Sequence, residues 1–162
     1  MTASMFHLMT HAFFKALLFL CAGAVIEAMH EEADIFKMGG LKDRMPVTFR
    51  CMTIGVLAIA GVPPLAGFFS KDAILAAAAE VSTPLYLIAV LTAFMTAFYM
   101  ARLLFVAFFG EVRPDCPAHE KNAYMRWPLI VLAALSVLGG LWGHFFGFGE
   151  WVRFGPVAAE GI

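Results

Sequence analysis

Residues 5–29 form an apolar stretch with a lysine near its middle, and this combination limits the chain to few folds. A membrane-spanning helix needs about 20 apolar residues, which this stretch provides, and it is too apolar for a soluble helix. An ionisable side chain at the depth of Lys15 costs roughly 3 kcal/mol on membrane-insertion scales. We therefore predict a membrane helix whose lysine serves the movement of protons or other ions.

Two histidines precede this lysine on the same side of the predicted helix. His7, His11 and Lys15 recur every four residues, and at about 100° per residue each step drifts by only about 40°. Lys15 is about ten residues from the nearer end of the stretch, roughly 15 Å of helix. That is too far for comfortable snorkelling to the interface, so we interpret Lys15 as a proton carrier, with snorkelling as the alternative.

The histidines could relay protons between Lys15 and water, because imidazole titrates near neutral pH. One alternative is a structural role at the interface, hydrogen-bonded to neighbouring helices. A second alternative is metal, since two histidines four residues apart can chelate zinc, but the metalloprotease motif has Glu directly after the first His. Leu8 occupies that position, and we predict no metal here.

The composition of the whole chain is typical of an integral membrane protein. It is 62% hydrophobic and 14% charged, with a mean hydropathy of +0.83, whereas an ordinary soluble domain is about half apolar and a quarter charged. The net charge of −1 gives no case for nucleic-acid binding. The three scattered cysteines form neither a disulfide framework nor a metal-binding pattern.

The apolar stretches predict an all-α, polytopic helical bundle in a single membrane domain, 1–162, with four full spans plus one short broken or re-entrant helix. Pro63 and Pro64 end the second stretch, because proline lacks the amide proton and clashes with the preceding turn. Gly67 lies where the chain restarts. The loops 30–45 and 110–126 carry three Lys or Arg each, so the positive-inside rule assigns no orientation. The predicted helices are 5–29, 46–62, 67–80, 85–109 and 127–148.

Further charged residues lie close to the predicted spans. Lys71 and Asp72 follow the proline break, and transporters use the carbonyls and helix ends at such breaks as ion sites. Lys71 is therefore a second candidate proton carrier with Asp72 as its tuning partner, unless both are solvated charges of a surface loop. Arg102 hardly deprotonates, so it would pair with an acid or snorkel. Glu27 is either an ion-pair group or an interfacial side chain.

The sequence carries no phosphate loop, flavin or nicotinamide fingerprint, iron–sulfur cysteine cluster or haem attachment motif. We therefore expect no cofactor on this chain and any redox chemistry on another. The chain begins almost inside its first predicted helix without a basic leading segment, which suggests a piece of a longer protein.

Three blocks of the sequence resemble a known family. In order and spacing they resemble the antiporter-like L-type subunit of proton-pumping NADH–quinone oxidoreductase (respiratory complex I). A weaker match runs through residues 93–110 and past Met125, so the resemblance covers most of the chain and suggests a central-to-C-terminal fragment of that far longer subunit. The blocks are His7-Leu-Met-Thr-His-Ala-Phe-Phe-Lys-Ala-Leu-Leu-Phe-Leu20, Lys37-Met-Gly-Gly-Leu41 and Gly61-Val-Pro-Pro-Leu-Ala-Gly-Phe-Phe-Ser-Lys-Asp72.

The resemblance implies a role for each of these residues. Lys15 would lie on the central polar axis of the membrane arm, and Lys71 would be a terminal proton-transfer residue beside Asp72. His7 and His11 would bridge protons along the axis.

The resemblance also implies a setting. The function would be proton translocation through the membrane arm, coupled to redox chemistry on partner subunits that hold NADH, flavin, iron–sulfur clusters and quinone. The partners would be other membrane subunits of complex I, especially neighbouring antiporter-like ones, in a bacterial inner (plasma) membrane rather than a mitochondrial one. Glu27 and Ala73 depart from the family pattern, where His and Glu are common.

Two alternatives remain open at this point. One is a subunit of a Mrp-type sodium/proton antiporter or of a membrane-bound hydrogenase, built on the same repeat. The other is a structural membrane module that assembles with a larger complex and moves nothing.

Overall fold

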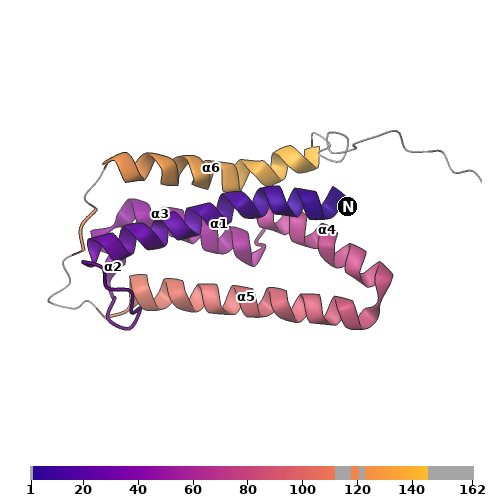
Figure 1. The fold of residues 1–162 in the computed structure, drawn as a ribbon, viewed down its shortest axis with the longest axis horizontal. Coiled ribbons are helices and arrows are strands. Elements are labelled where there is room, and N and C mark those ends of the chain that lie inside the picture. The colour runs from indigo at the N-terminus through magenta and orange to yellow at the C-terminus, as the bar shows by residue number, and fades with distance from the viewer. Residues whose placement is uncertain (1, 112–117, 121–122, 146–162) are drawn as a thin grey trace, which may run out of the picture.

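The structure is a computed structural model that describes residues 2–111, 118–120 and 123–145, and every regular element in these ranges is a helix (Figure 1). Three segments are long and apolar enough to cross a membrane: Ser4–Ala28, Thr83–Phe109 and Tyr124–Trp142. The all-α integral membrane class predicted from the sequence is confirmed. The helices are α1 (Thr2–Ala28), α2 (Leu41–Arg44), α3 (Pro46–Ala60), α4 (Ala66–Val81), α5 (Thr83–Phe109) and α6 (Ala123–Phe145).

The observed helices can be set against the predicted ranges. The ranges 5–29, 46–62, 67–80 and 85–109 correspond to α1, α3, α4 and α5. The range 127–148 corresponds to α6, with 146–148 outside the described residues. The short α2 was not expected; it follows Gly40, whose φ of 63° lies in the left-handed region.

Helices α3 and α4 together form one broken pass through the bundle. With 15 and 16 residues, each is about 23 Å long at 1.5 Å per residue, short of the roughly 30 Å hydrocarbon core of a bilayer. They follow one another along the length of the molecule, and α5 returns (Figure 1). The predicted span 46–62 is therefore shorter than expected and shares its pass with the helix after the break.

The break between α3 and α4 has a local cause. Gly61 adopts φ 84°, a left-handed conformation that favours glycine. Its N–H donates to Ala58 O at 3.1 Å, and the N–H of Val62 donates to Leu57 O at 3.0 Å, the bond pattern of a Schellman helix end. Pro63 and Pro64 follow, and because neither has an N–H to donate, the helix stops.

Small residues hold the start of α4 against its neighbours. A Cβ added at Gly67 would lie 1.7 Å from Ala58 O, and one added at Gly140 would lie 2.4 Å from the Cα of Ala66. Ala66 itself is fully buried. The restart of the chain is therefore clamped between the end of α3 and the middle of α6.

The helices pack unevenly around the core. Helix α1 packs on α3, α4 and α6, whereas α5 packs on α2, α3 and α4. Within the described part of the chain, α5 does not pack against α1 or α6. The outer side of α5 is apolar and exposed, as at Leu87, Phe94 and Phe98, which suits contact with lipid. The uneven packing leaves α1 and α5 apart.

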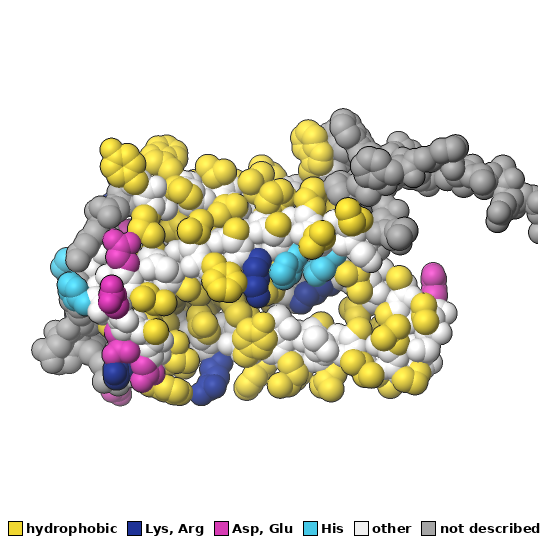
Figure 2. Space-filling view, viewed as in Figure 1, with side chains coloured by type: hydrophobic (Ala, Val, Ile, Leu, Met, Phe, Trp, Pro, Cys, Tyr) yellow, Lys and Arg dark blue, Asp and Glu magenta, His cyan; other side chains and the backbone are white. Residues whose placement is uncertain are grey.

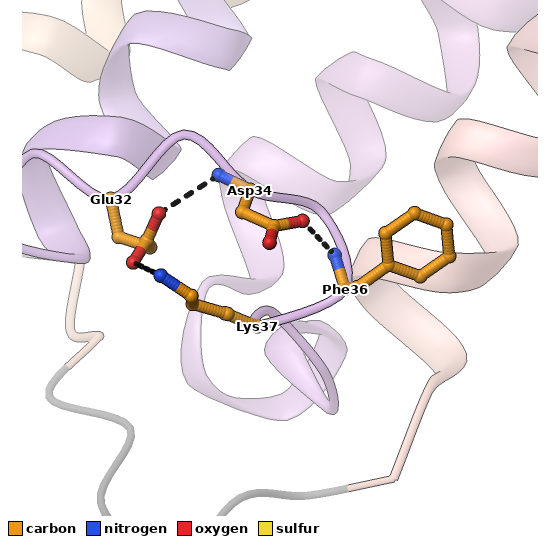
Figure 3. A network of polar contacts seen from close by, with 4 residues as sticks. All are labelled: Glu32, Asp34, Phe36 and Lys37. Carbon is orange, nitrogen blue, oxygen red and sulfur yellow. Dashed lines mark hydrogen bonds and ion pairs between the residues drawn. The ribbon is translucent and has the colours of Figure 1, made fainter.

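The loop between α1 and α2 is ordered by its own polar contacts (Figure 3). Glu32 accepts from the N–H of Asp34 at 3.1 Å and from Lys37 Nζ at 2.6 Å, and Asp34 accepts from the N–H of Phe36 at 2.9 Å. The hydrogen bond from Lys37 lowers the pKa of the Glu32 carboxyl, so this contact holds at neutral pH and is lost as the pH falls through the lowered pKa. The turn places the Phe36 ring 5.6 Å from the guanidinium carbon of Arg102 on α5.

We predict that Gly67→Ala destabilises the protein by about 3 kcal/mol, because the new Cβ overlaps the backbone of α3 and α4 must shift. The matched control is Gly23→Ala on α1, where a Cβ meets nothing within 4 Å, and a change within about 1 kcal/mol is expected. Thermal inactivation of the protein in its native membrane measures both. Equal thermal stability of the two variants would contradict the clamp.

Candidate functional site

A cavity of about 370 Å³ lies where α1 and α5 fail to pack. Figure 2 shows Lys, Arg and His side chains gathered in the middle of one otherwise largely apolar face. All four proton-transfer residues predicted from the sequence line the cavity: His7, His11, Lys15 and Lys71. Residues from two distant sequence blocks are thus brought to one place.

The histidines of α1 are held by contacts on two sides. Their ring centroids lie 5.6 Å apart, and the His11 ring lies 5.3 Å from that of the fully buried Phe14, edge to face. His7 Nδ1 lies 3.0 Å from Ser70 Oγ, and Ser70 donates to Gly67 O at 3.4 Å. Either His7 Nδ1 or Ser70 Oγ can donate in this contact, according to the tautomer of the imidazole.

Lys71 is bound by a carbonyl that the helix break sets free. Its Nζ donates to Ile59 O. In an unbroken helix this carbonyl would accept from the N–H of residue 63, but Pro63 has no N–H. The C-terminal end of a helix also carries a partial negative charge that favours a cation. The proline break therefore creates the binding partner of the lysine that follows it.

Lys15 lies at the border between two cavities. It lines the large one and a second cavity of about 150 Å³, with its Nζ 5.5 Å from the centroid of the Phe19 ring. Both ammonium groups are hydrogen-bond donors without an acceptor, so Lys15 and Lys71 do not bind each other directly. At about 30 Å³ per water, the large cavity has room for on the order of ten waters between them.

The other predicted site residues lie outside this cavity. Asp72 and Arg102 are exposed, and Arg102 stacks on the Phe36 ring. Glu27 lines a separate cavity of about 30 Å³ with Glu120. Among the described residues an ion pair joins Lys37 to Glu32, and none joins Asp72 to Lys71.

Glu120 caps the N-terminal end of α3, which the sequence did not indicate. Its carboxylate accepts from the N–H of Thr48 at 2.8 Å, from the Thr48 hydroxyl at 3.1 Å and from the N–H of Val47 at 3.4 Å. The residue that precedes α3, Met45, makes no side-chain cap. Helix α3 therefore has an acid at its N-terminal end and Lys71 at its C-terminal end, and both charges complement its dipole.

Some residues of the site escaped the sequence reasoning. Ser70 lay within a quoted block without a role of its own. Thr92, Thr96 and Tyr99 line the large cavity from α5. Their spacing at i, i+4 and i+7 within an apolar span was a readable signal, since such residues share one helix face.

Comparisons with known proteins show the family to which the chain belongs. A family model described as NADH:quinone oxidoreductase/Mrp antiporter, TM matches residues 1–96. NADH-quinone oxidoreductase subunit L of Mycobacterium tuberculosis is 53% identical over 83% of this chain and 22% of its own length. The subunit L of Rhodobacter capsulatus is 47% identical over 99% of this chain and 25% of its own length. The chain thus spans about a quarter of these curated relatives.

Solved structures also include a similar fold. A chain in the structure of the Mrp complex from Dietzia sp. DQ12-45-1b superposes with a TM-score of 0.81, over 91% of this chain and 36% of that one. Its sequence identity is 21%, so this likeness concerns the fold alone.

We predict that Glu120→Ala lowers the free energy of unfolding by about 1–2 kcal/mol, because two N–H groups at the start of α3 lose their acceptor. Glu80→Ala is the matched control, since Glu80 is exposed at the end of α4 and accepts none of the hydrogen bonds found among the described residues. Thermal unfolding of both variants in native membranes measures the difference. A Glu120→Ala protein as stable as Glu80→Ala would show that the cap contributes nothing.

Proposed function

We propose that this chain, which belongs to the NADH:quinone oxidoreductase/Mrp antiporter transmembrane family, forms part of a proton path through the membrane arm of an NADH–quinone oxidoreductase. The single observation that carries the proposal is the cavity lined by His7, His11, Lys15 and Lys71. Four groups that exchange protons meet around space for water inside an apolar bundle, and intramembrane ionisable residues generally serve ion or proton movement.

The chemistry of the cavity suits stepwise proton transfer. Lys71 has a carbonyl partner, Ile59 O, whereas the ammonium group of Lys15 lies 5.5 Å from the centroid of the Phe19 ring. Two like charges facing one cavity repel each other, so a proton on one lysine favours release from the other. A charge change in a neighbouring part of the assembly would shift this balance and drive protons in one direction.

The histidines suit the role of bridges between the lysines and water. A neutral imidazole donates through one nitrogen and accepts through the other, and Nδ1 of His7 lies within hydrogen-bond distance of Ser70 Oγ. His11 lies between His7 and Lys15 on α1. A proton taken up on one side of such a ring can be released on the other.

The remaining predicted residues have supporting roles in this proposal. Asp72, Arg102 and Glu27 set the local electric field and carry no protons along the path. Pro63, Pro64 and Gly67 form the helix break that creates the Lys71 site.

The proposal also includes the setting of the chain. It would lie in a bacterial plasma membrane beside other membrane subunits, with neighbouring antiporter-like subunits as its main partners. NADH, flavin, iron–sulfur clusters and quinone would be held by those partner subunits. The names of the bacterial relatives, NADH-quinone oxidoreductase subunit L, support this setting.

We predict that Lys15→Ala and Lys71→Ala each lower the number of protons moved per NADH oxidised by the share that this path carries, because each variant loses a proton-transfer group. The measurement compares fluorescence quenching of a pH dye with NADH absorbance in vesicles that carry the whole complex. The matched control is Lys42→Ala, an exposed lysine on α2 outside the cavity, which should leave the ratio unchanged.

The same assay separates the alternatives. Proton movement that requires a sodium gradient and continues without NADH would identify an antiporter subunit. Unchanged proton movement in both cavity variants would favour a structural module.

A further inference from the structure

Helix α5 supplies a polar wall to the cavity that the lysines and histidines do not explain. Thr92, Thr96 and Tyr99 line the large cavity and recur at i, i+4 and i+7, so they share one face of α5. The opposite exposed surface of the same helix is apolar, as at Leu87 and Phe98. The polar wall faces α1 and α4, which carry all four ionisable groups of the site.

The two threonines offer acceptors to the cavity. Thr92 Oγ1 donates to Ile88 O at 2.8 Å, and Thr96 Oγ1 donates to Thr92 O at 2.8 Å. Each hydroxyl has one hydrogen and two lone pairs. Because the hydrogen is used in the helix, what remains for the cavity is a pair of lone pairs that accept from water or from an ammonium group.

Tyr99 lies at the junction of two cavities. Three residues line both the 370 Å³ cavity and the 150 Å³ cavity: Lys15, Ile59 and Tyr99. Of these, Lys15 is the proposed proton carrier, and Ile59 supplies the carbonyl that binds Lys71. Among the residues with hydroxyl groups that line the large cavity, Tyr99 is the one that also lines the second cavity beside Lys15. A phenol hydroxyl both donates and accepts, and within the described part of the chain the Tyr99 hydroxyl has no hydrogen-bond partner.

We propose that Thr92, Thr96 and Tyr99 form a hydroxyl wall that orders the water between Lys15 and Lys71, with Tyr99 as the proton-passing member. The inference rests on the proposed function. In each transfer Lys15 releases a proton to an adjoining water, that water passes one of its own to the Tyr99 oxygen, Tyr99 releases its proton to a water on the other side, and a neutral Lys71 takes the last proton of the chain. One O–H bond forms as another breaks, and the tyrosine ends neutral as it began.

The threonines complete this path by holding the waters in line. Their lone pairs accept from water hydrogens, so each water keeps its own lone pairs toward the next donor. The cavity has room for on the order of ten waters at about 30 Å³ each, more than two lysines and two histidines alone could orient.

The competing explanation is that Tyr99 is an ordinary aromatic residue of a membrane helix whose hydroxyl does nothing. Tyr86 provides the comparison, because it lies on the same helix, lines neither cavity and is similarly exposed, at 37% against 49% for Tyr99. Tyr99→Phe and Tyr86→Phe remove the same single oxygen. A difference in proton movement between the two variants therefore reflects where the lost hydroxyl lies, because both variants lose the same atom.

The test measures proton uptake and NADH oxidation together in vesicles that carry the whole complex. Tyr99→Phe should lower protons moved per NADH by about two- to tenfold, the factor that one lost net hydrogen bond gives. Tyr86→Phe should leave the ratio unchanged. Thr96→Val keeps the shape of the side chain but loses the hydroxyl acceptor, so it should lower the ratio. Thr96→Ser keeps the hydroxyl acceptor, so its ratio should match that of the unchanged protein. Lys15→Ala is measured alongside.

The outcomes separate this inference from the function on which it rests. If Lys15→Ala leaves the ratio unchanged, the proposed function fails and the inference fails with it. If Lys15→Ala lowers the ratio but Tyr99→Phe behaves like Tyr86→Phe and Thr96→Val like Thr96→Ser, the hydroxyl wall alone is overturned. A Tyr99→Phe variant that loses assembled complex while keeping its ratio would also overturn it.

Discussion

The site depends on the hydrogen bond between the Lys71 ammonium group and the carbonyl of Ile59. A lysine inside an apolar bundle needs a partner, because burying an unpaired charge is costly. The two prolines supply that partner by removing the N–H groups that would otherwise occupy the last carbonyls of α3. Gly61 then turns the chain, and Gly67 lets α4 approach α3 closely enough for the lysine to reach back.

Helix α3 links this bond to the far end of the bundle. Its N-terminal N–H groups are bound by the carboxylate of Glu120, and its C-terminal carbonyl is bound by Lys71. Both charges are stabilised by the helix dipole, so the helix is fixed in position at its two ends.

The sequence predicted the parts of the site that depend on local spacing. His7, His11 and Lys15 share a face because of their four-residue repeat, and the structure places all three along one cavity. Lys71 could be singled out because it follows two prolines. The contact between His7 and Ser70 joins residues 63 positions apart, and the cap on α3 joins residues 72 positions apart. Such contacts arise from the arrangement of helices, which no local pattern specifies. Tyr99 had a readable spacing, but hydroxyl residues are common in membrane helices, so the pattern gained meaning only beside the cavity.

Incomplete packing between α1 and α5 is as important to the site as its charged residues. Had these helices closed on each other, little space for water would remain beside the ammonium group of Lys15, and its charged state would be costly. The cavity instead leaves room for water, which can solvate either protonation state of the lysine. In the proposed function, this space is what allows Lys15 to bind and release a proton inside the membrane.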